Sequence, residues 1–335
     1  MLSIRFLGSI ICLLLCFNTS VGQLNPNKVL LNKIDSLVST WDNPKNPGGA
    51  IAIYKENELL FEKYFGLEDM AQKVKISKNT PFHLASISKQ FTGMCIALLE
   101  EQGKIKLNDE ICPFFPALKL CKGIRIKHLL SHSSGIREAS VIAILSGYVN
   151  FKGELPVKRN NNVFLTKVLE KERDVNFVCG AESAYTNTNY MLLAEIVEKV
   201  SGMQFKDFAD SAIFKPLKMK HTKVLDFREP SKIGGYHSNG KRFVKRKLKS
   251  GTYGDDNIVT TLQDMALWNQ NFYKNKLGRQ NQSLIHKTTT NLELNDGKPS
   301  NRGYGWFIGK YRGRKIIYRD GENDLHTGFN IHFPE

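Results

Sequence analysis

The sequence predicts an α/β (α+β) protein in which an antiparallel sheet is flanked by helices and interrupted by an inserted all-α region. Three observations lead to this prediction. The 335-residue chain has β-rich runs near both ends, an amphipathic helix pattern after the first of them, and mostly helical periodicity in its middle. The hydrophobic fraction of 41% supplies a core for one large or two moderate domains, which excludes disordered and fibrous proteins.

The first strands are predicted as a hairpin, because residues 49–54 and 59–64 are β-rich and the polar residues 55–58 separate them. A helix pattern begins near Ser86 and ends at Gly103. Ser86 is therefore expected at or near a helix N-terminus. The apolar residues that recur along one face of this helix are Phe91, Met94, Cys95, Leu98 and Leu99.

The rest of the chain gives the order of the remaining elements. Helices are predicted at 126–131, 163–171 and 189–200, and, after a basic loop, at 261–273. Further strands are predicted at 304–308, 315–318 and 329–333. The expected organisation is a signal peptide at 1–22, a sheet domain formed by 23–106 and 226–335, and a mostly α insertion at 107–225.

The N-terminus has the three parts of a secretory signal: a basic start at Arg5, an apolar run over 6–17, and small residues before Gln23. The apolar run is too short for a membrane anchor, and Leu15 is a poor residue before a lipidated Cys16. We therefore expect export, with the mature chain starting near Gln23 in the periplasm or outside the cell.

Metal and cofactor sites are not expected. Four of the six cysteines lie beyond the signal and no CxxC pair occurs, so a cysteine zinc site is unsupported. Cys112 and Cys121 could close a small loop in an oxidising compartment, and the sequence leaves their bonding open. His128 and His132 have i,i+4 spacing, but no HExxH glutamate accompanies them, which favours a structural role.

The charge balance is strongly basic. Lys and Arg number 48 against 32 Asp and Glu, a net charge of +16, which favours polyanionic surroundings. The run 241–249 holds six cations and no acid, and in an exported protein it suits an anionic wall polymer or membrane surface. A solvated loop is the alternative for this run. Nucleic acid is not expected as a partner.

The candidate chemistry starts with the S-x-x-K element at Ser86–Lys89, which places a lysine beside a serine hydroxyl on one face of a helix. Such a serine is a nucleophile when an adjacent group accepts its proton. A second copy at 238–241 lies in the basic stretch, and Tyr-x-Asn occurs at 148–150, 185–187 and 273–275. Spacing alone cannot choose among these copies.

The sequence around these motifs resembles the β-lactamase-related serine hydrolases, a group of class C β-lactamases, D-alanyl-D-alanine carboxypeptidases and related esterases. Four ordered blocks carry the resemblance, which runs from about Gly48 to the last residue: 82–92, 126–136, 185–202 and 254–268. It implies a β-lactamase/penicillin-binding-protein-like fold with the site between sheet and helices. It also assigns Ser86 as acylated nucleophile, Lys89 as proton partner, Tyr185 as second general acid or base, and Asn187 as a substrate-orienting residue.

Two features depart from this family. Its third motif, Lys-Thr-Gly or His-x-Gly, is replaced by Arg319-Asp-Gly321, with a second candidate at His326-Thr-Gly328. Arg319, Gly321 and His326 are therefore all candidates for substrate binding. Arg319 could meet a substrate carboxylate, whereas Asp320 would repel it. The given chain ends at Glu335, where family members usually continue, so we expect an incomplete sheet.

Two functions follow as hypotheses. The first is an exported serine hydrolase that forms an acyl-enzyme on Ser86 with the peptide, ester or lactam carbonyl of a small-molecule or peptide substrate. The second is a catalytically inactive protein of the same fold that attaches to an anionic wall or membrane surface. A reactive Ser86 distinguishes them.

Overall fold

The computed structural model describes residues 26–148, 161–226, 233–248 and 251–334. The signal predicted at 1–22 lies outside these residues. Contacts divide the chain into two compact units, one ending at Trp41 and one comprising Asp42–Glu335. Helix α1 (Pro26–Ser39) belongs to the first unit, and every other element belongs to the second. Among the helices described, none is long and apolar enough to cross a membrane.

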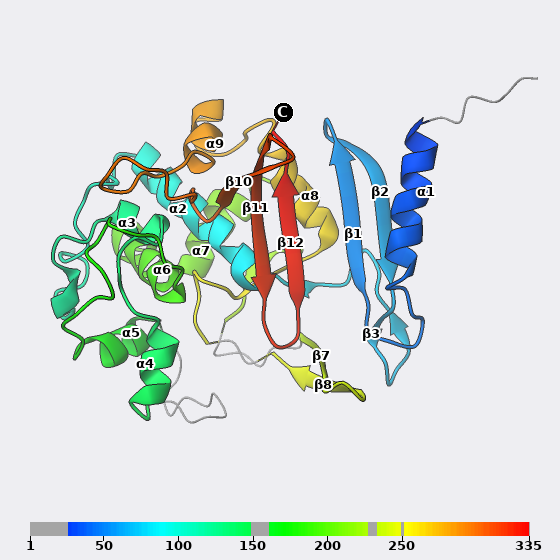
Figure 1. Ribbon diagram of the computed structural model, residues 1–335, viewed down its shortest axis with the longest axis horizontal. Coiled ribbons are helices and arrows are strands. Elements are labelled where there is room, and N and C mark those ends of the chain that lie inside the picture. Colours follow the sequence, from blue (N-terminus) through cyan, green and yellow to red (C-terminus); the bar gives the residue numbers. More distant parts are fainter. Residues whose placement is uncertain (1–25, 149–160, 227–232, 249–250, 335) are drawn as a thin grey trace, which may run out of the picture. The chain divides into compact units, whose positions relative to one another are not determined.

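The predicted hairpin is confirmed as strands β1 (Gly49–Lys55) and β2 (Glu58–Phe65), which pair antiparallel. Near the other end of the sequence, β10 (Phe307–Tyr311), β11 (Arg314–Glu322) and β12 (Thr327–His332) form a three-stranded antiparallel sheet, drawn in brown and red in Figure 1. Within the described residues, no ladder joins this sheet to the hairpin. The antiparallel pairing agrees with the sequence prediction, while the strands form separate ladders.

The helix expected after Ser86 is also confirmed. A 3-10 turn, η1 (Ala85–Ser88), leads into α2 (Lys89–Glu101), of which only the last turn reaches the surface. Helix α2 packs against α6 (Asn187–Ser201) and α9 (Gln282–Thr288), and η1 packs against β11. The start of α2 therefore lies where the helices meet the sheet of β10, β11 and β12 (Figure 1).

The mostly α character of the middle region is observed. Besides α6, its helices are α3 (Ile126–Leu130), α4 (Ala139–Leu145), α5 (Asn161–Leu169) and α7 (Phe205–Ala209), followed by a π-helical turn at Asp210–Phe214. Helix α8 (Leu262–Gln270) follows the basic region, close to the predicted 261–273. Short strands complete the described fold: β3 (Leu67–Asp69), β4 (Val74–Lys75), β5 (Phe82–His83), β6 (Lys223–Val224) and β9 (Ile258–Thr260).

The basic run is not a loop, so that prediction is wrong. Strand β7 (Gly234–Ser238) pairs with β8 (Phe243–Lys247), which carries most of the run, and Lys245 forms an ion pair with Asp69. The sequence of β8 does not show the alternation of apolar and polar residues that predicts a strand, because its cations outnumber its apolar residues. Lys249 lies outside the described residues. Elsewhere, Cys112 and Cys121 form a disulfide.

Candidate active site

The S-x-x-K serine lies in a constrained turn. Ala85, immediately before it, has a φ of 45°, a conformation that residues with a side chain seldom adopt. The Ala85 amide donates to Nδ1 of His83 at 3.0 Å, which holds the turn. The Ser86 hydroxyl then lies 3.0 Å from Lys89 Nζ and 2.7 Å from the Tyr185 hydroxyl. The structure therefore brings the three predicted catalytic residues together.

Lys89 is fully buried, with 0% of its surface exposed, and its ammonium group is saturated with acceptors. Nζ donates to Ser86 Oγ at 3.0 Å, to Asn187 Oδ1 at 2.7 Å and to the carbonyl of Asp255 at 2.7 Å. An ammonium group has three N–H donors, and each finds an acceptor here. Lys89 Nζ is thus held in place beside the nucleophile.

Tyr185 and Asn187 are positioned by the start of α6. The Asn187 amide N–H donates to Glu138 Oε2 at 2.7 Å, and the Tyr185 hydroxyl donates to Asn187 Oδ1 at 3.1 Å. The Tyr185 ring packs against the buried His132 ring, with a centroid distance of 4.6 Å. With 42% of its surface exposed, Tyr185 can also meet a substrate. Asn187, expected to orient substrate, here links Tyr185 to Lys89.

Arg319 is buried at 2% exposure, and its guanidinium is engaged by the site itself. Nη2 donates to the Tyr185 hydroxyl at 2.9 Å and Nε donates to the Ser86 carbonyl at 3.1 Å. The guanidinium therefore contacts the phenol, and the expected contact of Arg319 with a substrate carboxylate stays a prediction. Asp320 is exposed, because neighbouring strand residues point to opposite faces.

Gly321 packs closely against the catalytic turn. A Cβ atom at this position would lie 2.4 Å from the Leu84 carbonyl oxygen and 3.1 Å from the Ser86 amide nitrogen, so only glycine fits without movement. Strand β10 pairs with β11 only as far as Tyr318, so the stretch from Arg319 to Glu322 has an edge that β10 leaves free.

The structure thus brings Arg319 and Gly321 to Ser86. His326 lies instead beside His83, at a ring distance of 5.9 Å, and within the described residues no hydrogen bond joins it to the catalytic groups. Its role in substrate binding stays a prediction. Burial lowers the pKa of both His83 and His326 to about 4, so both rings are neutral at pH 7.

Two further titratable groups face the site. Burial, reinforced by the charge of Asp256, raises the pKa of Asp255 to about 8, although Lys89 acts in the opposite direction. Burial and the nearby cations, Arg319 first among them, hold the pKa of His132 well below its usual range. The sequence reading missed Asp255 as a partner of Lys89, since no motif indicates that a backbone carbonyl serves as a ligand.

The other candidates have structural roles or lie elsewhere. His128 accepts the Arg125 amide at 3.1 Å, and His132 accepts the Thr186 amide at 3.3 Å, as helix and loop supports. In the described part of the chain, no group of three His, Cys, Asp or Glu is arranged to hold a metal. The second S-x-x-K copy falls in the turn between β7 and β8, and the Tyr148 copy of Tyr-x-Asn extends beyond the described residues.

Comparisons with known proteins agree with this geometry. The Beta-lactamase family profile matches residues 35–334. Protein flp of Staphylococcus aureus (strain MW2) is 27% identical over 302 residues, which is 86% of this chain and 57% of that protein. Penicillin-binding protein 4* of Bacillus subtilis (strain 168) is 26% identical over 307 residues, 86% of this chain and 66% of that protein. The chain therefore spans less than two thirds of the length of these relatives.

Solved structures match as well. The octameric penicillin-binding protein homologue from Pyrococcus abyssi superposes with a TM-score of 0.77 and 26% identity, covering 90% of this chain and 70% of that one. FmtA from Staphylococcus aureus has a TM-score of 0.73 over 92% of this chain and 79% of its own, at 24% identity, which indicates a shared fold. With its fold, its matched range and its Ser86–Lys89–Tyr185 cluster, the chain belongs to the Beta-lactamase family, whose function is of the serine-hydrolase type.

Proposed function

We propose that this protein is a serine hydrolase that forms an acyl-enzyme on Ser86 with the carbonyl of an ester, peptide or lactam. The observation that carries the proposal is the hydroxyl of Ser86, held between Lys89 Nζ at 3.0 Å and the Tyr185 hydroxyl at 2.7 Å. A serine is activated by a neighbouring base within hydrogen-bond reach. Both distances meet that requirement before any substrate is bound.

Tyr185 is the group best placed to accept the proton. Lys89 Nζ lies within hydrogen-bond distance of Ser86 Oγ, Asn187 Oδ1 and the Asp255 carbonyl, which hold it in place beside the serine. The Tyr185 oxygen receives a hydrogen bond from Arg319, and the charges of Lys89 and Arg319 lie 5.1 Å and 5.0 Å from its ring centroid. In the proposed reaction Tyr185, ionised to the phenolate, takes the serine proton.

The proposed reaction proceeds through an acyl-enzyme on Ser86. Ser86 Oγ forms a bond to the carbonyl carbon while its proton moves to the Tyr185 oxygen, and the tetrahedral oxyanion collapses with departure of the leaving group. Tyr185 returns the proton to that leaving group, and water later hydrolyses the acyl ester by the reverse sequence. The Ser86 amide and an amide on the free edge of β11 are the candidates for holding the oxyanion.

The test is covalent labelling of the purified protein with a fluorophosphonate and, in parallel, a fluorescent penicillin, read by intact mass. Wild type should gain one adduct, and Ser86→Ala should lose it. Ser238→Ala is the matched control, because Ser238 begins the second S-x-x-K copy and is exposed at the end of β7. Labelling of Ser238→Ala should equal that of wild type.

The two probes also separate classes of substrate. Preference for the fluorophosphonate supports an esterase-like site, and preference for the penicillin supports recognition of a lactam. A folded wild-type sample that gains no adduct with either probe contradicts the hydrolase. It leaves the alternative, an inactive protein of this fold that binds a surface.

We also propose that the protein acts outside the cytoplasm, at an anionic wall or membrane surface. The basis is the signal-like N-terminus, the Cys112–Cys121 disulfide and the basic strand β8, whose Arg246 and Lys247 are exposed. Mass spectrometry of the exported product should give an N-terminus near Gln23. Sedimentation with anionic vesicles should exceed that with neutral vesicles, and Arg246→Gln/Lys247→Gln should reduce the difference; equal sedimentation with both vesicles contradicts surface attachment.

A further inference from the structure

The side chain of His83 supports the turn that carries Ser86. His83 ends the short strand β5 and pairs with Val259 of β9, and the next amide, of Leu84, donates to the Ile258 carbonyl at 2.9 Å. Only 4% of the surface of His83 is exposed. The imidazole therefore extends from a backbone that the neighbouring strand holds in place.

The backbone that His83 supports is strained. Ala85 has a φ of 45°, a left-handed conformation that is unfavourable for a residue with a side chain and persists only where surrounding contacts hold it. Here the Ala85 amide donates to His83 Nδ1 at 3.0 Å. Because Ala85 directly precedes the nucleophile, loss of this acceptor would let the turn relax. The Ser86 hydroxyl would then move relative to Lys89 and Tyr185.

A second donor reaches the same ring nitrogen. The side-chain amide of Asn323, in the turn between β11 and β12, lies 2.9 Å from His83 Nδ1. Its oxygen Oδ1 accepts the backbone amides of Leu325 and His326 at 2.9 Å each, so its nitrogen Nδ2 is the atom that faces His83. The two donors share the lone pair of Nδ1. That nitrogen therefore carries no proton, and the proton of the neutral ring is on Nε2.

The turn that carries Asn323 is itself held in place. Besides the two bonds to Oδ1, the Asn323 amide donates to the His326 carbonyl at 2.9 Å. Strand β7 packs against the same turn, because a Cβ atom added at Gly235 would lie 2.8 Å from both the Cβ and the carbonyl oxygen of Leu325. The turn therefore presents a fixed donor to the imidazole of His83.

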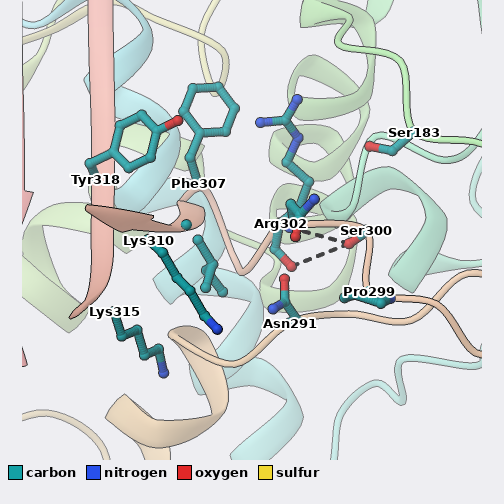
Figure 2. A pocket seen from close by; sticks show the side chains of 12 residues that line it. Ser183, Asn291, Pro299, Ser300, Arg302, Phe307, Lys310, Lys315 and Tyr318 are labelled. Carbon is teal, nitrogen blue, oxygen red and sulfur yellow. Dashed lines mark hydrogen bonds between the residues drawn. The ribbon is translucent and has the colours of Figure 1, made fainter. Parts of the chain in front are cut away.

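Neither side chain belongs to the pocket drawn in Figure 2. Residues 291–302 form this pocket together with β10 and β11, and Arg302 is one of its lining residues. Of the described residues, those that line it include neither His83 nor Asn323. A substitution at either position should therefore change the reaction at Ser86 more than the binding of a molecule in this pocket.

We propose that His83 is a positioning residue for Ser86, and that Asn323 holds the His83 ring in the tautomer that accepts the Ala85 amide. An effect on acylation rests on the proposed hydrolase function, whereas the tautomer and the hold on the turn do not. His83 acts through the backbone of Ala85. The β11–β12 turn, whose Asn323 is 240 residues from His83 in the sequence, is in this way joined to the nucleophile.

The tautomer is measured first, on the full chain labelled with nitrogen-15, from two-bond proton–nitrogen correlations of the histidine rings at pH 7. The His83 signals are those that disappear in His83→Asn. Nδ1 should have the chemical shift of an unprotonated nitrogen and Nε2 that of a protonated one. In Asn323→Asp the donor becomes an acceptor, so a proton should appear on Nδ1. A protonated Nδ1 in wild type, or His83 shifts unchanged in Asn323→Asp, overturns the proposal.

The effect on Ser86 is measured as the rate of fluorophosphonate labelling and as kcat and KM for 4-nitrophenyl acetate. His83→Leu removes the acceptor and should lower the labelling rate and kcat by about 10²-fold with little change in KM. His83→Asn has Oδ1 as many bonds from the backbone as Nδ1, and it should recover about tenfold of that loss. Both variants lose the imidazole, so an effect of stability alone, followed by urea unfolding, would lower both rates equally and overturn the positioning role.

Asn323→Asp removes the donor while its carboxylate can still accept the amides of the turn, and it should slow labelling by about tenfold or more. Asp324→Asn is the matched control, since Asp324 is the next residue of that turn and is exposed, and it should label like wild type. Wild-type rates in both His83→Leu and Asn323→Asp overturn the positioning role. A folded wild type that neither labels nor hydrolyses the ester contradicts the hydrolase and with it the effect on acylation, and the ring tautomer then decides the hold on the turn.

Discussion

The guanidinium of Arg319 donates a hydrogen bond of 2.9 Å to the phenolic oxygen of Tyr185, which in turn lies 2.7 Å from the Ser86 hydroxyl. A cation from the sheet of β10, β11 and β12 therefore contacts the group that we propose as the acceptor of the serine proton. Arginine stays charged at every working pH, and its rigid fork also reaches the Ser86 carbonyl. In the proposed reaction Arg319 is a positioning residue for Tyr185.

Replacing this cation should slow acylation. Arg319→Met removes the donor to the Tyr185 oxygen and to the Ser86 carbonyl, so we expect labelling of Ser86 by a fluorophosphonate to slow by about 10²- to 10⁴-fold. Arg319→Lys keeps a charge but loses the second hydrogen bond, and it should recover part of the rate. An Arg319→Met protein that labels like wild type would show that Tyr185 needs no cation.

The close approach at Gly321 leads to a second prediction. In Gly321→Ala the new Cβ would lie 2.4 Å from the Leu84 carbonyl oxygen, so β11 or the turn at Ser86 must move. We expect a loss of about 1–3 kcal/mol in the free energy of unfolding, together with slower labelling of Ser86. Urea unfolding and labelling kinetics measure both effects.

Gly309→Ala, on β10, is the matched control for this substitution, because a Cβ at Gly309 would have no neighbouring atom closer than 3.6 Å. Its stability should change by less than about 0.5 kcal/mol. Equal effects of the two substitutions would mean that the loss reflects strand glycine in general rather than contact with the catalytic turn.

Much of the fold was predictable because its signals are local. The β1–β2 hairpin and α2 each show their own periodicity, and the S-x-x-K spacing places Ser86 and Lys89 on one turn. Strand β8 was missed because cations mask its alternation, and α1 (Pro26–Ser39) was not assigned from the sequence.

The residues of the site could be predicted from the sequence, but the contacts between them could not. Tyr185 and Arg319 are 134 residues apart in the sequence, and they meet because β11 packs against η1. The sequence left Arg319–Gly321 and His326–Gly328 as equal candidates for the third motif. The distinction depends on which segment of the β11–β12 hairpin packs against Ser86, a tertiary relationship that no spacing records.

Acid should destabilise the protein through its buried histidines. Burial lowers the pKa of His83, His326 and His332 to about 4, from an ordinary value of 6.5. Between these values the unfolded chain binds more protons than the folded one, so stability is present above about pH 6.5 and is lost as the pH falls toward 4. Urea midpoints at pH 7, 5.5 and 4.5 should decrease in that order.

One of these histidines can be tested by itself. His332 packs against the rings of Phe272 and Trp306, and its Nε2 is buried without a partner. His332→Phe keeps an aromatic ring and removes the titration, so its stability should depend less on pH between 6.5 and 4, whatever its absolute value. If the stability of His332→Phe depends on pH as steeply as that of wild type, His332 does not contribute to the loss of stability in acid.

Asp255 should act in the opposite direction. Burial raises its pKa to about 8 from an ordinary 3.8, with Asp256 adding repulsion and Lys89 opposing the rise. The folded protein therefore holds a proton that the unfolded chain has lost, so the contribution of Asp255 to stability is fully present below about pH 4 and is lost as the pH rises toward 8.

Asp255→Asn supplies an uncharged side chain of nearly the same shape and should flatten the pH dependence in that window. At pH 9 we expect it to be more stable than wild type by more than about 1 kcal/mol, and at pH 4 the difference should be small. Asp324→Asn, at an exposed position, is the control and should follow wild type at both values. If wild type and Asp255→Asn lose stability equally between pH 6.5 and 9, then Asp255 is already ionised in the folded protein. Its carboxylate is then a counterion to Lys89.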